Sequence, residues 1–441
     1  MSLRLLDGDP RRFARVSRGI DGIAGPFLGV RGVLDYTLDT TQTPLWSLSA
    51  GLNVTTGLQT ASFIGKTYNV PVWQELFPLI DSTMPPPIGG SMGKSGLKGG
   101  FAIAADANDV MYVASGNTVV ATKLNHPLWT YTSPDPQAIM YRVAVAPDGT
   151  VYASDFASTI YAIDSTGKQK WTAPGSHVSA LAVGAGAVYA LAYDTSVPSA
   201  VLFAYSPADG SALWNLPIGG GNFDLALGKN GTLYALSDAI HAIDPNTHAL
   251  LWSGGVGGAS GLAIGSDGTI YQISINGPLF AVNPADGTTK WTSPAHFEDA
   301  YTGPSIGPDG TLYWCAVSHL LAFNPSSVTT SPPHGKYAFQ VVLPNGAICQ
   351  APPTVGADGR LYVSADAALF VYDGTTTSSP GRLEWSTTMS GDTYASPVLL
   401  SSGDVVVARD TELDAFHAGT TLATTSWPRG GGGNASTGSA Q

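Results

Sequence analysis

A motif of about forty residues is repeated eight times along this 441-residue chain. Its clearest copy contains the turn Asp148-Gly-Thr150, the apolar run Ile160-Tyr-Ala-Ile-Asp164 and the ending Gly167-Lys-Gln-Lys-Trp171. Successive copies end 38 to 48 positions apart. The aromatic residues that close them are Trp129, Trp171, Trp214, Trp252, Trp291, Phe339, Trp385 and Trp427. A period near forty is typical of four-stranded units, whereas leucine-rich, ankyrin and tetratricopeptide repeats are all shorter, at about 20–34 residues.

A single copy contains four short strands joined by tight turns. The apolar run Leu262-Ala-Ile264 suits an innermost strand, where neighbouring units crowd around an axis. Ser266-Asp-Gly-Thr269 follows, and Asp and Gly accept the positive φ of hairpin turns. The other strands contain Tyr271, Leu279-Phe-Ala-Val282 and Trp291. We therefore expect an all-β fold, a β-propeller of four-stranded antiparallel blades. Eight blades fit the spacing best, and seven or nine remain open.

The closing aromatic residues are predicted to be structural blade anchors. A lone sheet cannot bury both faces, so each aromatic ring should pack between adjacent blades, where burial contributes about 1.5–3 kcal/mol. The acids Asp148, Asp267, Asp309 and Asp358 recur at one turn position. Such repetition indicates turn chemistry, because a catalytic acid would break the pattern once. The eight histidines are scattered, without His-Glu-x-x-His spacing. We predict no catalytic, cofactor-binding or metal residues.

Two endings resemble the repeat of a known superfamily. Ala162-Ile-Asp-Ser-Thr-Gly-Lys-Gln-Lys-Trp171 and Ala281-Val-Asn-Pro-Ala-Asp-Gly-Thr-Thr-Lys-Trp291 are similar to the tryptophan-docking repeat of the pyrroloquinoline-quinone (PQQ)-like β-propellers. That superfamily includes quinoprotein alcohol dehydrogenases and a non-enzymatic lipoprotein of the outer-membrane assembly machine. The resemblance covers roughly three quarters of the chain and is specific for the blade. The dehydrogenases carry adjacent cysteines and a calcium-binding set of acid and amide side chains, which this chain lacks. We therefore expect no cofactor.

The segment before the repeats divides into two parts. Residues 1–33 form a basic N-terminal arm, for which an ordinary solvated extension is the first interpretation and docking on an acidic partner is the functional one. The residues assigned to docking are Arg11, Arg12, Arg15 and Arg18. Residues 34–98 begin with a degenerate half-repeat, because Tyr36 to Trp46 aligns with Tyr161 to Trp171. A Gly/Pro-rich linker follows, and the whole N-terminal stretch either helps to close the ring or lies against it as an accessory.

The propeller is assigned to residues 99–429, and residues 430–441 have the Gly/Ser-rich composition of a flexible tail. Within the linker, Gly89-Gly-Ser91-Met-Gly93 matches the nucleophile-elbow pattern. That motif requires a strand leading into a helix, and Pro85-Pro-Pro87 precedes it here. We assign it instead to a loop entering the first blade.

The chain has two cysteines, in neighbouring repeats. Cys315 follows the Tyr313 strand of the sixth copy, and Cys349 begins the inner strand of the seventh. They can approach each other across two blades and form a disulfide, or they can be two buried free thiols. A disulfide would favour an oxidising compartment.

Composition bears on partners and location. Only 12% of residues are charged, and the net charge is −12, which argues against nucleic-acid binding. No run of eighteen apolar residues predicts a membrane span, and no signal-peptide core is recognisable. The hydroxyl-rich, weakly charged surface favours an extracellular or virion protein. We predict a non-catalytic scaffold whose partners are proteins or copies of itself, rather than a small-molecule substrate. A PQQ-dependent dehydrogenase or another enzyme using the central funnel is the alternative.

Overall fold

The computed structural model describes residues 102–438 with short gaps, and within residues 1–101 the backbone of seven strands. The gaps are residues 125, 157–158, 176, 185, 195–198, 222, 257–258, 276–277, 295–298, 301, 329–335, 376–380, 390, 410–411, 434–435 and 437. The chain forms two compact units. One comprises Met1–Ile88 with His417–Gly419, and the other Gly89–Phe416 with Thr420–Gln441.

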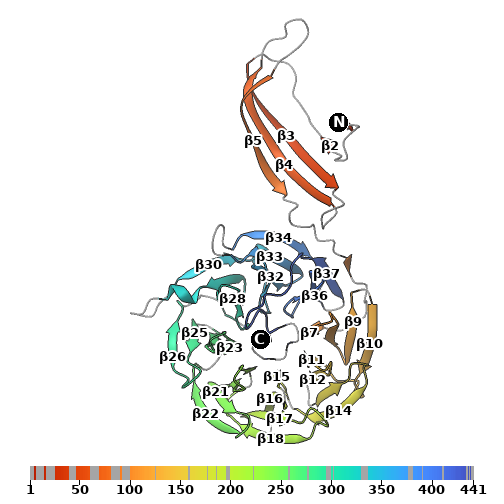
Figure 1. Ribbon diagram of the computed structural model, residues 1–441, viewed down its shortest axis with the longest axis vertical. Coiled ribbons are helices and arrows are strands. Elements are labelled where there is room, and N and C mark those ends of the chain that lie inside the picture. Colours follow the sequence, from red (N-terminus) through yellow and green to blue (C-terminus); the bar gives the residue numbers. More distant parts are fainter. Residues whose placement is uncertain are drawn as a thin grey trace. The chain divides into compact units, whose positions relative to one another are not determined.

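The larger unit is a ring of eight four-stranded antiparallel sheets, which confirms the predicted eight-bladed β-propeller (Figure 1). In each of the first seven blades the strands follow chain order from the centre outwards. The first four blades are β7 (Gly100–Ala105), β8 (Met111–Ser115), β9 (Thr118–Lys123) and β10 (His126–Thr132); β11 (Met140–Val145), β12 (Val151–Asp155), β13 (Thr159–Ile163) and β14 (Gln169–Pro174); β15 (Ala180–Val183), β16 (Val188–Asp194), β17 (Ser199–Tyr205) and β18 (Ala212–Pro217); and β19 (Asp224–Leu227), β20 (Leu233–Leu236), β21 (Ile240–Asp244) and β22 (Ala249–Gly254).

The remaining blades complete the ring, and two short 3-10 helices, η1 (Pro325–Ser327) and η2 (Pro344–Gly346), lie at turns of the sixth blade and after it. The fifth to seventh blades are β23 (Ala259–Ile264), β24 (Ile270–Ser274), β25 (Leu279–Val282) and β26 (Thr289–Thr292); β27 (Ser305–Ile306), β28 (Leu312–Ala316), β29 (His319–Phe323) and β30 (Tyr337–Val342); and β31 (Thr354–Val355), β32 (Arg360–Ala365), β33 (Ala368–Asp373) and β34 (Leu383–Thr388).

The eighth blade joins two distant parts of the chain. Its inner strands are β35 (Val398–Leu399), β36 (Asp404–Ala408) and β37 (Leu413–His417), and its outermost strand is β6 (Gly90–Ser91). Asp414 pairs with Ser91, and Ala415 with Gly90. The segment predicted to be a loop entering the first blade therefore contains an outer strand that closes the ring. The correction has a simple cause, since a two-residue edge strand has no periodicity by which sequence could reveal it.

Turns and buried tyrosines repeat in the blades as the motif predicts. In the turn before β12, Asp148 Oδ1 accepts a hydrogen bond from Thr150 N at 2.9 Å, and Gly149 has φ +81°. Tyr152 then packs beside Trp171 of its own blade, with ring centroids 5.7 Å apart. Corresponding Tyr and Trp rings are 5.8 to 5.9 Å apart in the first, third, fourth and fifth blades. One local design is thus reused around the ring.

The smaller unit contains a separate three-stranded antiparallel sheet and a short strand pair. The sheet consists of β3 (Gly25–Leu38), β4 (Trp46–Gln59) and β5 (Asn69–Ile80), in that order. The pair consists of β1 (Arg4–Leu5) and β2 (Ala14–Arg15). The degenerate half-repeat therefore covers the end of β3 and the start of β4. The division predicted between residues 33 and 34 falls inside β3, because backbone pairing extends the strand past the repeat pattern.

Candidate functional site

A cavity of about 540 Å³ lies at the centre of the ring. It is lined by residues at or just before the innermost strands of several blades, together with part of the C-terminal segment. We call the face of the ring at which the innermost strands begin the upper face. Among the described residues of the lining, three carry a charged group: Arg142, Asp224 and Arg429. With two positive groups and one acid, these lining residues have an excess of positive groups, whereas the whole chain has a net charge of −12.

Arg142 is held in position by two contacts. Its Nε donates a hydrogen bond to the Ser179 carbonyl of the next blade at 2.6 Å. Its guanidinium lies 4.3 Å from the centroid of the Tyr141 ring, a distance at which the cation is attracted to the aromatic face. No described residue accepts a hydrogen bond from its terminal nitrogens. A pre-oriented guanidinium beside a cavity is well suited to binding a carboxylate.

Asp224 lies at the start of β19 and links two blades. Its Oδ2 accepts a hydrogen bond from Leu262 N of β23 at 2.9 Å, and its Oδ1 accepts one from Leu225 N at 2.8 Å. Burial raises the pKa of this carboxyl group above its usual value, although the two backbone bonds and the charge of Arg142 act in the opposite direction. Asp224 therefore has a structural role between blades and also contributes a polar group to the cavity.

The C-terminal segment crosses the centre of the ring and forms part of the cavity wall. Residue 423 donates its backbone N–H to the Val355 carbonyl at 2.9 Å, and Val355 donates to the Pro428 carbonyl at 2.9 Å. Ile306 donates to the Trp427 carbonyl at 2.7 Å, and Leu227 to the Gly438 carbonyl at 2.7 Å. These bonds reach the inner strands of three blades. Composition predicts a flexible tail from residue 430; within that segment, Ser436 and Gly438 have hydrogen-bond partners on inner strands of the ring.

Arg429 is the main anchor of that segment and is only 2% exposed. Its Nε donates to the Pro397 carbonyl at 3.1 Å, and its Nη2 donates to the carbonyls of Ser396 at 2.9 Å and Ile103 at 3.3 Å. Its Nη1 donates to the Gly433 carbonyl and to Ser436 Oγ. Burial lowers the pKa of Arg429 to about 10. One side chain thus bridges the eighth blade, the first blade and the Gly-rich segment.

An apolar patch on the upper face lies beside Arg142. It comprises Ile139, Tyr141 and Phe156, together with His177, and Phe223 adds a further exposed ring where it lines the same cavity as Tyr141 and Arg142. Phe156 is 55% exposed, Ile139 49% and Phe223 38%. The Phe156 ring meets Tyr141 edge-on at 5.8 Å, and His177 edge-on at 5.7 Å. Exposed aromatic residues next to an oriented arginine are typical of surfaces that bind other proteins.

The predicted blade anchors make contacts to the next blade. Trp129 Nε1 donates to the Ser165 carbonyl at 2.9 Å, and the Trp129 ring lies over Gly167, where an added Cβ would be 2.8 Å from it. Six others meet the following blade in related ways, through a carbonyl, a glycine or a neighbouring ring: Trp171, Trp214, Trp252, Trp291, Phe339 and Trp385. In the fourth blade His248, with φ +60°, takes the place of the glycine, and its ring stacks with that of Trp214 in the third blade, with ring centroids 4.9 Å apart.

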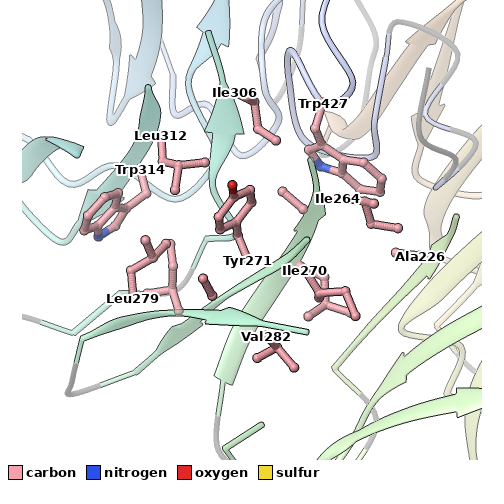
Figure 2. Packing of buried hydrophobic residues seen from close by; sticks show 14 of the residues in the cluster. Ala226, Ile264, Ile270, Tyr271, Leu279, Val282, Ile306, Leu312, Trp314 and Trp427 are labelled. Atoms are coloured by element: carbon pink, nitrogen blue, oxygen red, sulfur yellow. The ribbon is translucent and has the colours of Figure 1, made fainter. Parts of the chain in front are cut away.

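Trp427 differs from the other predicted anchors. It does not belong to an outer strand, because β6 takes that position in the eighth blade. Instead it is 2% exposed and lies in the cluster around Ile264 and Ile306, as Figure 2 shows. The correct spacing of 42 residues after Trp385 is therefore misleading. Trp427 belongs to the segment that crosses the centre of the ring.

The two cysteines are joined in the structure. Cys315 in β28 and Cys349 before β31 form a disulfide with a Cα–Cα distance of 5.9 Å. Both residues are buried, at 0% and 1% exposure. The bond connects the sixth blade to the segment that enters the seventh.

The predicted docking arm lies largely beyond the described structure. The backbone of Arg15 belongs to β2, and Arg11, Arg12 and Arg18 lie outside the described residues. Docking of this arm on an acidic partner stays a prediction. Within the described part of the chain, no three His, Cys, Asp or Glu side chains are grouped as metal ligands. The same part contains no helix with the length and hydropathy needed to span a membrane.

Sequence reasoning missed the three charged groups of the cavity. Arg142 lies within β11 and Asp224 begins β19, and each is the one charged residue of an otherwise uncharged inner strand, which was the available signal. Arg429 stands alone among the last thirty residues as a Lys or Arg. Its partners at residues 103, 396 and 397 could not be identified from sequence, because they become neighbours only when the ring closes.

The fold and the cavity define an eight-bladed β-propeller whose centre is crossed by its own C-terminal segment. The chain belongs to the PQQ-like propeller family described as outer membrane protein assembly factor BamB, whose model matches residues 45–223 and 236–306. This match confirms the family resemblance drawn from the repeat endings at Trp171 and Trp291. No curated protein matches the chain.

Solved structures show the same fold at low sequence identity. BamB from Moraxella catarrhalis is 15% identical with a TM-score of 0.58, over 76% of this chain and 99% of that one. The C-terminal WD40 domain of Sif2 is 12% identical with a TM-score of 0.63, over 75% and 98%. Quinohemoprotein alcohol dehydrogenase from Comamonas testosteroni is 15% identical with a TM-score of 0.58, over 77% of each chain. At these identities the likeness concerns the fold alone.

The residues around the cavity do not fit the quinone and calcium of the dehydrogenases. Asp224 is the one carboxylate among the described residues that line the cavity, and both of its oxygens already accept backbone hydrogen bonds. The disulfide joins Cys315 to Cys349, 34 positions apart, rather than two adjacent cysteines. Arg429 and its segment also take up part of the centre of the ring. The lack of a cofactor nevertheless stays a prediction.

Proposed function

We propose that this protein is a non-catalytic scaffold that binds an acidic segment of a protein partner on the upper face of its ring. The observation that carries the proposal is the pairing of Arg142 with the exposed apolar patch. Arg142 supplies oriented donors for a carboxylate, and Phe156 and Phe223 supply apolar area that binding would remove from water. Aromatic and arginine side chains that become buried on binding account for most of the affinity in protein interfaces.

The finer part of the proposal is that the chain is a structural subunit of a virion or an extracellular assembly. Its low content of charged residues supports that setting. So does the buried disulfide, because such bonds persist mainly in oxidising environments. The BamB-type propeller supports an interaction role in general terms, since family members include an assembly factor.

Site-specific cross-linking tests the upper face directly. A photoreactive phenylalanine analogue replaces Phe156 in the full chain, expressed in the cells that naturally make it, and a second chain carries it at Leu250 on the outer rim. Both positions are about equally exposed, at 55% and 51%. We expect one dominant cross-linked protein at position 156, with a yield at least tenfold lower when Arg142→Glu is added. Absence of that product, or equal products at both positions, would contradict the proposal.

Two further readouts address the assembly and the enzyme alternative. The cross-linked partner is expected in sedimented particles or in the medium, and recovery from the cytosol alone would contradict the virion or extracellular setting.

Incubation of the purified chain with PQQ and Ca²⁺ is expected to give no dye-linked oxidation of alcohols. Clear turnover would instead establish the dehydrogenase alternative.

A further inference from the structure

The N-terminal sheet has one long apolar face, and its central strand shows this most simply. Along β4, apolar and polar or small residues alternate over fourteen positions. Because successive strand residues belong to opposite faces, every second residue shares a face. Six of the seven residues on one face are apolar, and Thr completes the set: Trp46, Leu48, Ala50, Leu52, Val54, Thr56 and Leu58. The other face carries Ser47, Ser49, Gly51, Asn53, Thr55, Gly57 and Gln59.

The register with β3 extends the same face. Residues directly opposite each other in an antiparallel pair belong to one face. The partners of the apolar β4 residues contain no charged or amide side chain: Leu38, Tyr36, Leu34, Gly32, Val30, Leu28 and Pro26. The two charged residues of β3, Arg31 and Asp35, are paired with Asn53 and Ser49 and so belong to the polar face. The division between the faces is therefore maintained on both strands.

The third strand contributes further large apolar residues to this face. Through two register shifts, β5 places Ile80, Phe77, Trp73 and Val70 opposite Ala50, Leu52, Thr56 and Leu58. Glu75, opposite Val54, is the one charged residue of β3, β4 and β5 on this face. The shifts are informative, because a slip of one residue would exchange the faces of a strand. Here they bring Trp73 and Phe77 to the apolar side.

The area of this face matches that of a stable protein interface. Strands of 14 residues extend about 46 Å, and three strands span about 14 Å, so the face measures about 650 Å². An apolar patch of this size exceeds what monomeric proteins usually expose, about 300–600 Å². Two such faces together give about 1,300 Å², within the range of about 1,200–2,000 Å² for specific complexes. The area that one copy offers is thus what a second copy needs.

We propose that the apolar face of the sheet formed by β3, β4 and β5 packs against the same face of a second copy of this chain. Stacked in this way, two amphipathic sheets form a β-sandwich about 10 Å apart with polar outer faces. A shared face on both subunits is the arrangement that two-fold symmetry requires. The inference goes beyond the proposed function, because it assigns a different surface and a different occupant, and its test leaves the upper face unchanged.

The test is the mass of the full chain in solution. Analytical ultracentrifugation over a hundredfold concentration range is expected to show a dimer. Leu52→Glu places a charge at the middle of the apolar face and should weaken dimerisation at least tenfold. Asn53→Glu, the next residue on the same strand but on the polar face, is the matched control and should change it less than twofold.

A milder variant separates association from folding of the sheet. Leu52→Thr combined with Val54→Thr retains strand propensity while removing apolar area, and should also weaken the dimer at least tenfold. A monomeric wild-type chain would overturn the proposal, including one whose sheet is covered by its own ring or that binds lipid vesicles. Three other results would also overturn it: an oligomer that persists in both Leu52 variants, a dimer that Asn53→Glu weakens equally, and a trimer.

Discussion

The blades and the C-terminal segment are held by two different kinds of contact. Neighbouring blades use the same contact many times, as when Trp129 lies over Gly167 and Trp171 over Gly210. The C-terminal segment has single contacts, chiefly Arg429 and Trp427, which reach inner strands of several blades. Loss of a repeated contact should weaken one blade boundary, whereas loss of a single contact should weaken several at once.

Arg429→Ala should have the largest effect, because it removes a cation that satisfies buried carbonyls in two blades. Each carbonyl left without a partner costs about 1–3 kcal/mol, so we expect a loss of about 3–5 kcal/mol in the free energy of unfolding. Denaturant titration followed by tryptophan fluorescence measures it. Arg382→Ala, whose side chain is 60% exposed, is the control and should change stability by less than about 1 kcal/mol. Similar losses in both variants would show that Arg429 has no special role.

Replacing both cysteines by serine tests a contact that occurs at only one blade boundary. The bond closes a loop with a sequence separation of 34 residues, for which the chain-entropy model gives about 3–4 kcal/mol. A lower Tm, matched by the wild-type protein under reducing conditions, is the expected result. If reduction of the wild-type protein leaves its Tm unchanged, the bond does not contribute to stability.

Gly167→Ala tests a repeated contact and should have a smaller effect. The residue has φ +88°, and an added Cβ would be 2.8 Å from the Trp129 ring. Backbone strain and the displaced ring should together cost about 1–3 kcal/mol. Gly310→Ala is the control, since that glycine has φ +81° but nothing within 4 Å of an added Cβ. Equal losses in thermal unfolding would mean that strain acts alone and that the Trp129 contact contributes nothing.

Tyr152→Phe, compared with the wild-type protein at alkaline pH, should show the smallest difference in the free energy of unfolding. Burial raises the pKa of Tyr152 to about 12, from an ordinary value of 10.0. The folded state therefore holds the hydroxyl proton of Tyr152 more tightly than the unfolded state does. The resulting contribution to the free energy of unfolding is complete below pH 10 and is lost as the pH rises towards 12. The free energy of unfolding should fall with pH across this window, and less steeply in Tyr152→Phe. Identical slopes would show that Tyr152 ionises normally in the folded protein.

The sequence predicted local features well and long-range contacts poorly. Gly167 and Asp148 could be assigned to turns because the groups that interact with Asp148 lie two residues away. The spacing of Trp171 and its equivalents likewise predicted the number of blades. Trp427 has the right spacing and the wrong location, because the outer position of the last blade is taken by β6.

The candidate site was outside the reach of such reasoning. Arg142 and Asp224 become members of one cavity only when the second and fourth blades face a common axis. The link from Arg429 to Ile103 joins residues 326 positions apart. No local pattern encodes that approach, since it depends on the curvature accumulated over eight blades.

The repeat by itself determined the all-β class, the four-stranded unit, the family and the best count of blades, because each depends on turns and strands encoded within about forty residues. Only the tertiary structure decided how the ring closes, which of the aromatic residues leaves the blades, and which charges meet at the centre. The physical reason is distance along the chain. Hydrogen bonds within a turn form wherever its sequence occurs, whereas those of β6 and Arg429 require ring closure.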